Sequence, residues 1–358
     1  MTIKASGTSL SFTEIVAEFG NPADNKVGNY RVTFDNTPEG GSFSDLPLDA
    51  GIPQSGPISF SDFYSKQLNI VVKGYGGAAE SWASKDAASA YDNGNVEVIG
   101  NPGKPKPDRN DPSAWQDGKT VKINVNKTIG SSMPGSNENY RCALKTGNWP
   151  SETTLSVDVG SEGIITGQGG AGGNGSTGED ATAPSGEDGS SGLGIQHSPI
   201  TVNVAAGGII QNGYGGGGGG GGAVRDPNKE GEDRYYGGGG GGGGAGYPGG
   251  QGGIGASDDE GTGSPGGGGT ATVGGGFGAG GGGYGGDGGR GGDVVIGQQS
   301  GQQGDGSGPV GGGGPGGGAG SNGDAIRATM AQAGNVNISA SGEIRGDQHY
   351  SVAPGTIT

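Results

Sequence analysis

The sequence contains a single cysteine, Cys142, among 358 residues. No disulfide can therefore form within the chain, and oxidation cannot cross-link this fold. Hydrophobic residues make up 28% of the chain and aromatic residues 6%, which leaves little material for a large apolar core. No apolar stretch is long enough to cross a bilayer, and the first residues lack the apolar segment of a secretory signal. We expect a protein that is made in a cytoplasm and does not insert into a membrane.

Basic residues are also scarce, because 20 Lys and Arg stand against 36 Asp and Glu, a formal net charge of −16. Binding to nucleic acid depends on cationic side chains at phosphates, so we expect no nucleic-acid partner. The chain has two histidines, His197 and His349, and neither lies in a periodic segment. Since glycine-rich structure builds no obvious pocket, we expect no enzymatic activity, no cofactor and no metal.

Glycine is what the sequence has in excess. Of 94 glycines, 18 lie in residues 1–160 and 76 in residues 161–358. Together with 19 prolines they form roughly a third of the chain, a level typical of disordered sequence. Order is favoured by two glycine blocks of equal length, 215–222 and 237–244, and by single bulky residues such as Tyr214 and Phe277 that interrupt the runs.

Glycine runs can pack without a hydrophobic core. A polyglycine II helix has three residues per turn and no internal hydrogen bonds, so its peptide groups point outward to neighbouring helices. Collagen is excluded because the blocks are continuous. At about 3.1 Å per residue, eight glycines form a rod of about 25 Å. We expect rods, joined by loops at their ends, over 167–175, 213–222, 237–246, 249–255, 266–283, 285–292 and 311–320.

Short β-strands are expected where apolar and polar residues alternate. They cover residues 68–73, 121–125, 155–159, 200–204 and 336–340. A Gly-x-Ile segment follows each of the last three and is expected to turn the chain. Self-similar units of this kind indicate stacked repeats.

The expected fold is therefore mostly β with irregular segments. Its divisions are a small N-terminal docking region at 1–66, a β-rich middle domain at 67–160, a polyglycine II sandwich with long end loops at 161–325, and a C-terminal strand and tail at 326–358.

A motif of Ser, aromatic, hydroxyl, acid and apolar residue begins at Ser11, Ser42 and Ser59. Serine with an acid three positions on is a helix-start signature. A region this small is marginal alone, so we expect it to dock on another protein, although a self-sufficient small domain remains open. The expected docking residues are Phe12, Ile15, Phe60, Phe63 and Tyr64.

The segments 143–175 and 199–222 resemble the glycine-rich receptor-recognition proteins at the tail-fibre tips of tailed bacteriophages. The segments 10–20 and 58–66 are similar to the N-terminal part of many phage tail proteins, while residues 78–139 carry no such motif. The resemblance implies a polyglycine II sandwich in the virion, at a tail fibre or tail tip, with variable distal loops that contact a bacterial outer-surface glycan or outer-membrane protein. It also implies that the N-terminal region binds other tail or fibre proteins.

Residues 223–236 separate the two glycine blocks, and we call this segment the insert. Because tyrosine and arginine are enriched at binding hot spots, we expect the insert to contact the receptor. The candidate receptor-binding residues are Arg225, Asp226, Asn228, Lys229, Glu230, Asp233, Arg234, Tyr235, Tyr236, Tyr247, Asp258, Asp259 and Glu260. The alternative is that the residues of the insert are only solvated turn residues with no part in binding. The three consecutive acids are either cation ligands or a solvated charge cluster. A purely structural tail protein without receptor contact stays open, as does the choice between one copy and a homotrimer.

Overall fold

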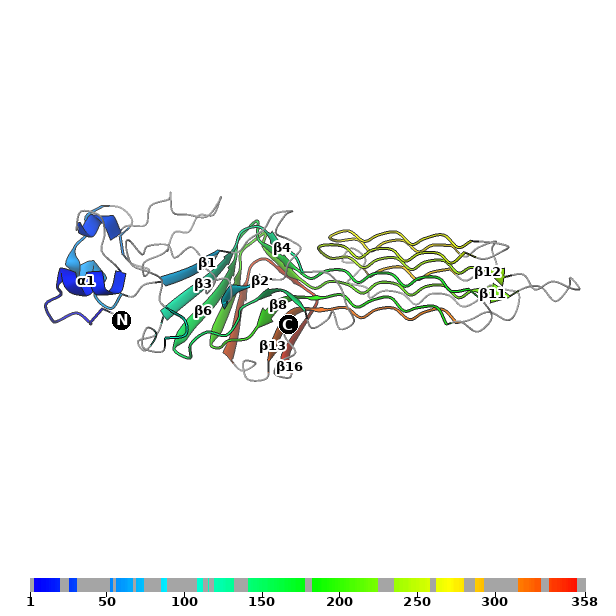
Figure 1. Cartoon of the computed structure of the whole chain (residues 1–358). Coiled ribbons are helices and arrows are strands. Elements are labelled where there is room, and N and C mark those ends of the chain that lie inside the picture. Colours follow the sequence, from blue (N-terminus) through cyan, green and yellow to red (C-terminus); the bar gives the residue numbers. More distant parts are fainter. Residues whose placement is uncertain are drawn as a thin grey trace, which may run out of the picture.

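The computed structural model describes residues 3–19, 26–30, 52–53, 56–66, 69–73, 85–88, 108–111, 115, 119–131, 141–177, 182–224, 235–257, 262–279, 287–292, 315–329 and 335–352. The molecule is elongated (Figure 1). A small N-terminal unit lies at one end, stacked β-sheets lie in the middle, and long glycine-rich runs extend to the other end. The fold is mostly β, with little helix.

Three parallel sheets form the middle of the molecule, and we call them the β-helix. The first sheet contains β1 (Asn69–Lys73), β3 (Lys119–Val125), β6 (Thr153–Val159), β9 (Ile200–Val204) and β14 (Val336–Ala340). The second contains β4 (Thr128–Ile129), β7 (Ile164–Thr166), β10 (Ile209–Gln211) and β15 (Glu343–Arg345). The third contains β2 (Lys85–Asp86), β5 (Cys142–Lys145), β8 (Ser191–Ile195), β13 (Asp324–Thr329) and β16 (Asp347–Val352). From β3 onward the chain visits the three sheets in rotation, so each circuit adds one strand to each.

Like side chains stack on like side chains in this β-helix. Ile123 pairs with Val157, which pairs with Val202 on the next strand, and Ile338 follows. The first three are fully buried in a core shared by all three sheets. Because strand side chains alternate between faces, each apolar row continues through the stack. The predicted alternation and stacking are confirmed.

The second and third sheets depart from the sequence-based expectation. The Gly-x-Ile segments do not merely turn the chain, since β7, β10 and β15 are strands of the second sheet. The third sheet was not predicted at all. The segments of β5 and β8 are buried almost throughout and do not alternate between apolar and polar residues, so they carry no local strand signal. They form strands because a parallel neighbour lies alongside.

The glycine-rich runs are insertions into the β-helix. The chain leaves after β7 and returns at β8, and it leaves again after β10 and returns at β13. Nevertheless β8 pairs in parallel with both β5 and β13. The predicted linear division into successive domains therefore differs from the structure, because residues 326–352 supply strands that complete the β-helix.

The described glycine-rich runs form one packed body, which we call the glycine lattice. It comprises residues 167–176, 183–190, 213–222, 237–246, 248–256, 263–270, 273–279, 287–292 and 315–323. Its hydrogen bonds repeat every third residue. The N–H groups of Gly238, Gly241 and Gly244 all donate to the run at 167–176, at 2.8–3.0 Å. Residues 238–246 of the same run also donate to or accept from five further runs. Most polar backbone groups are thus paired without a side chain.

Two features of the lattice differ from the expected rods. Residues 266–283 do not form one rod, because the chain reverses at Thr270–Val273, where the N–H of Thr270 donates to the carbonyl of Val273. The run 183–190 was not predicted as a rod, and the run 315–323 was predicted only as far as residue 320. They carry glycine at every third position, as in Gly317, Gly320 and Gly323, where an added Cβ would overlap a neighbouring carbonyl. The sequence signal that would have predicted these two runs is glycine at every third position, rather than a continuous block of glycines.

The N-terminal unit has its own aromatic core. It contains α1 (Phe12–Phe19), η2 (Val27–Tyr30) and η4 (Phe60–Phe63). Buried Ile15, Phe19, Tyr30 and Phe63 pack together, and the rings of Tyr30 and Phe63 meet edge to face with centroids 5.6 Å apart.

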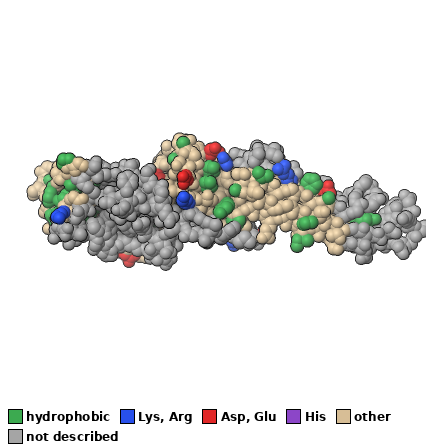
Figure 2. All heavy atoms as spheres, turned by 90° about the horizontal axis from the view of Figure 1, so that it is seen from above, with side chains coloured by type: hydrophobic (Ala, Val, Ile, Leu, Met, Phe, Trp, Pro, Cys, Tyr) green, Lys and Arg blue, Asp and Glu red, His purple; other side chains and the backbone are tan. Residues whose placement is uncertain are grey.

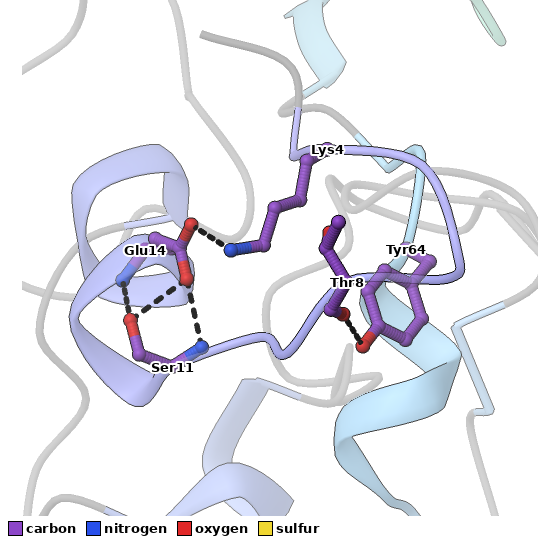
Figure 3. Close-up of polar contacts among 5 residues, drawn as sticks. All are labelled: Lys4, Thr8, Ser11, Glu14 and Tyr64. Atoms are coloured by element: carbon purple, nitrogen blue, oxygen red, sulfur yellow. Dashed lines mark hydrogen bonds and ion pairs between the residues drawn. The ribbon is translucent and has the colours of Figure 1, made fainter.

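Two copies of the serine motif cap the helices of this unit. The carboxylate of Glu14 accepts bonds from the N–H and hydroxyl of Ser11, both at 2.8 Å, and pairs with Lys4 at 2.6 Å (Figure 3). Asp62 accepts the same two bonds from Ser59. The copy at Ser42 lies outside the described residues.

Candidate functional site

The free end of the glycine lattice carries a short antiparallel hairpin (Figure 1). It consists of β11 (Ala223–Val224) and β12 (Tyr235–Tyr236), with Ala223 opposite Tyr236. We call this the distal end, and the end next to the β-helix the proximal end. The hairpin continues two interior glycine runs, so its position follows from the lattice beneath it.

Several connections of the lattice converge at the distal end. Ser176, where the first run ends, accepts a bond from Gly238 N–H at 3.0 Å, and its hydroxyl accepts one from Gly222 N–H. Gly238 in turn accepts from Ala256, and Ala256 accepts from Gly263. The connections that span 177–182, 223–236 and 257–262 therefore start and finish beside one another.

Most of the predicted receptor-binding residues lie in these connections, outside the described residues. They are Arg225, Asp226, Asn228, Lys229, Glu230, Asp233, Arg234, Asp258, Asp259 and Glu260. Tyr235 and Tyr236 form β12, and the Tyr236 side chain is 8% exposed. Tyr236 therefore packs at the base of the connection that follows β11. The connections that contain the other candidates start and finish at the same end of the lattice.

Tyr247 does not lie with the other candidates. It sits in the turn after the run 237–246, at the proximal end, where its N–H donates to Gly167 and its carbonyl accepts from Ser131. Ser131 follows β4 of the β-helix. The full length of the lattice separates Tyr247 from the distal hairpin, so the two cannot share one contact surface.

The side of the glycine lattice offers no broad apolar face. On the face that Figure 2 shows, the described lattice residues present mostly backbone and side chains that are neither charged nor hydrophobic, with scattered hydrophobic side chains. The large apolar side chains exposed there are Ile254, Val273 and Phe277.

The five predicted docking residues occupy different positions in the N-terminal unit. Ile15 and Phe63 are fully buried in its core, so they hold the unit together and are not free to touch a partner. Phe12 and Tyr64 are half-buried, and Phe60 is exposed beside Phe12, with ring centroids 6.4 Å apart. The hydroxyl of Tyr64 donates to the carbonyl of Thr8 (Figure 3).

The titratable groups of the N-terminal unit include one strongly shifted carboxyl. The side-chain bond from Lys4, with the bonds from Ser11, lowers the pKa of Glu14 to about 2. Its carboxylate is therefore ionised over the whole physiological range. The shift reflects the ion pair with Lys4 first and the helix-capping bonds from Ser11 second.

The titratable groups of the β-helix are arranged for structure. Burial raises the pKa of the Cys142 thiol to about 12, against opposing effects of Arg327 and Lys145. Burial also lowers the pKa of His197, whose Nε2 bonds the carbonyl of Thr153 at 3.0 Å. The Cys142 thiol is therefore not poised as a nucleophile at neutral pH.

The third sheet holds one buried charged network. Asp324, at the start of β13, pairs with Arg327 on the same strand and with His349 Nδ1 of β16. Asp324 and Arg327 are buried, whereas the His349 side chain is largely exposed. The network lies where the glycine lattice rejoins the β-helix, and it fixes that junction.

Within the described ranges, no three His, Cys, Asp or Glu side chains gather as ligands for a metal ion. A search of the same part of the chain finds no helix long and apolar enough to span a bilayer.

No protein-family model matches this chain. No curated protein matches it either. Among solved structures, the chain is similar to one in the crystal structure of the gp37–gp38 adhesin tip complex of the bacteriophage S16 long tail fibre, with 18% sequence identity and a TM-score of 0.40. The similarity covers 96% of this chain and 100% of that one.

Proposed function

We propose that this chain is an adhesin of a tailed-phage tail fibre or tail tip. It binds a bacterial outer-surface receptor, a glycan or an outer-membrane protein, through the connections at the distal end of the glycine lattice. The observation that carries the proposal is the convergence of those connections at the end farthest from the N-terminal unit (Figure 1). The N-terminal unit binds other tail or fibre proteins, and the chain has no catalytic activity.

We further propose that the lattice runs are polyglycine II helices. The three-residue repeat of their hydrogen bonds supports this, since such a helix has three residues per turn and outward peptide groups. The central run at 237–246 bonds six neighbouring runs, the number that surrounds each rod in hexagonal packing. A lattice of this kind holds its end loops on a rigid base, which reduces the entropy lost on binding.

The residues of the insert support a recognition role. Residues 225–234 carry charges of both signs, which makes them suited to polar contacts with a receptor. Their removal should not affect folding, because β11 and β12 close the hairpin below them.

The test replaces residues 225–234 with a short Gly-Ser turn while β11 and β12 are kept. We expect a melting temperature close to that of the parent and at least tenfold weaker binding of labelled protein to host cells, or a changed host range. The matched control replaces Ala271 and Thr272, in the proximal turn, with Gly-Ser, and it should bind host cells like the parent. Parental binding by the distal variant would refute the assignment of this loop.

A further inference from the structure

Glu18 and Lys119 form an ion pair between the N-terminal unit and the β-helix. Lys119 Nζ lies 3.0 Å from Glu18 Oε1, although 101 residues separate them along the chain. The side chains are 3% and 1% exposed for Lys119 and Glu18 respectively, so both charges are removed from water. Such a pair is unlike the surface pair of Lys127 and Glu162, whose side chains are 48% and 76% exposed.

The pair joins two parts with separate hydrophobic cores. Glu18 lies on the buried face of α1 together with Ile15 and Phe19, whose side chains belong to the aromatic core of the N-terminal unit. Lys119 is the first residue of β3, two positions before Val121, whose side chain belongs to the core of the β-helix. Among the residues that the structure describes, none belongs to both of these clusters. A charged contact, rather than a shared apolar core, thus connects the described parts here.

Burial makes this contact selective for geometry. A charge removed from water carries a large desolvation cost, which is offset only when the opposite charge and its hydrogen bonds are correctly placed. An apolar interface tolerates sliding, because dispersion contacts have no direction. If the N-terminal unit rotated on the β-helix, Glu18 and Lys119 would each be buried without the other.

We infer that the Glu18–Lys119 pair is an orientation lock, which selects one seating of the N-terminal unit on the β-helix. The N-terminal unit and the glycine lattice lie at opposite ends of the β-helix (Figure 1). A change in the seating angle would therefore displace the distal end by a large amount. The lock fixes the direction in which the glycine lattice projects from the structure to which the N-terminal unit is attached. This inference does not depend on what the distal end binds.

The experiment measures the distance between spin labels on the two parts. Labels are placed at Ala5→Cys and Ala206→Cys, two exposed positions in the full-length chain, while native Cys142 is buried and stays unlabelled. The parent should give one narrow distance distribution. Glu18→Gln and Lys119→Gln should each broaden it at least twofold, and the charge swap of Glu18→Lys with Lys119→Glu should restore a narrow distribution.

Glu162→Gln removes the exposed ion pair of the β-helix and should leave the distribution narrow. Near-ultraviolet circular dichroism reports whether the aromatic core of the N-terminal unit survives in each variant. Because Lys119 lies outside that core, Lys119→Gln tests the lock even if Glu18→Gln disturbs α1. Narrow distributions in both single variants, or a folded charge swap that stays broad, would overturn the inference.

Discussion

The side-chain amide of Gln211 donates a hydrogen bond to the main-chain carbonyl of Ala271 at 3.1 Å. Gln211 ends β10 of the β-helix, and Ala271 lies in a proximal turn of the glycine lattice. The same amide donates to Thr166 Oγ1 of β7 at 2.8 Å. One buried side chain therefore connects two strands of the β-helix to a lattice run that follows 60 residues later.

Gln211→Ala should loosen this connection. It removes the donor to the carbonyl of Ala271, which lies in an exposed turn, and the donor to the buried hydroxyl of Thr166. Loss of the donor to a buried group typically costs about 1–3 kcal/mol. We expect faster hydrogen exchange at the N–H groups of Gly246 and Thr270, measured by mass spectrometry. Gln251→Ala removes an exposed side chain from the lattice and serves as the control. Equal exchange rates in both variants would contradict this role for Gln211.

Interior glycines of the lattice should not tolerate a methyl group. An added Cβ at Gly240 would overlap the carbonyl oxygen of Gly253, and overpacking of this kind costs about 1–3 kcal/mol. Gly276 meets nothing within 4 Å, so Gly276→Ala is a matched control on the outer surface. Chemical denaturation should show a loss of stability for Gly240→Ala and a neutral or slightly favourable change for Gly276→Ala, because alanine restricts the unfolded chain.

Cys142 should be unreactive until the β-helix opens. Its pKa of about 12 against an ordinary 9.0 lowers the thiolate fraction by about a thousandfold at pH 8. We expect very slow labelling by a thiol reagent in the native protein and ordinary labelling in guanidinium chloride. The variant Ser161→Cys, in an exposed turn, should add one fast thiol beside the slow one. Two fast thiols in the native state would show that β5 is not protected.

His197 should make the protein less stable in mild acid. Because burial lowers its pKa in the folded state, the unfolded chain binds a proton first as the pH falls below about 6.5. Stability is therefore greatest above that pH and declines as the pH falls from about 6.5 towards the folded pKa. Urea denaturation between pH 5 and 8 should show this slope in the parent and a smaller slope in His197→Gln.

Gln251→Ala, which changes an exposed and uncharged side chain, is the control for this measurement. It should keep the parental decline in acid. An unchanged slope in His197→Gln would assign the decline to other groups, the buried carboxylates among them.

The sequence by itself determined the elements whose residues carry a local signal. Alternation in Leu155–Val159 and Ile200–Val204 was enough to predict β6 and β9, because one face of each strand is buried. The glycine blocks required close packing of bare backbone, and the serine motif at Ser11 predicted the start of α1. Each of these depends on spacing along the chain, which the sequence states directly.

The tertiary structure alone decided how these elements connect. The third sheet forms from segments such as Cys142–Lys145, which become strands only because a parallel neighbour supplies hydrogen-bond partners. The reversal at Thr270–Val273 changes how many times the chain crosses the lattice, and that number sets the end at which each later loop emerges. The earlier reversal at Tyr247, between the runs 237–246 and 248–256, brings the connections at 223–236 and 257–262 to the same end and leaves Tyr247 at the other. Glycine has no side chain with which to specify its neighbours, so register and direction in the lattice come from the β-helix strands at its base.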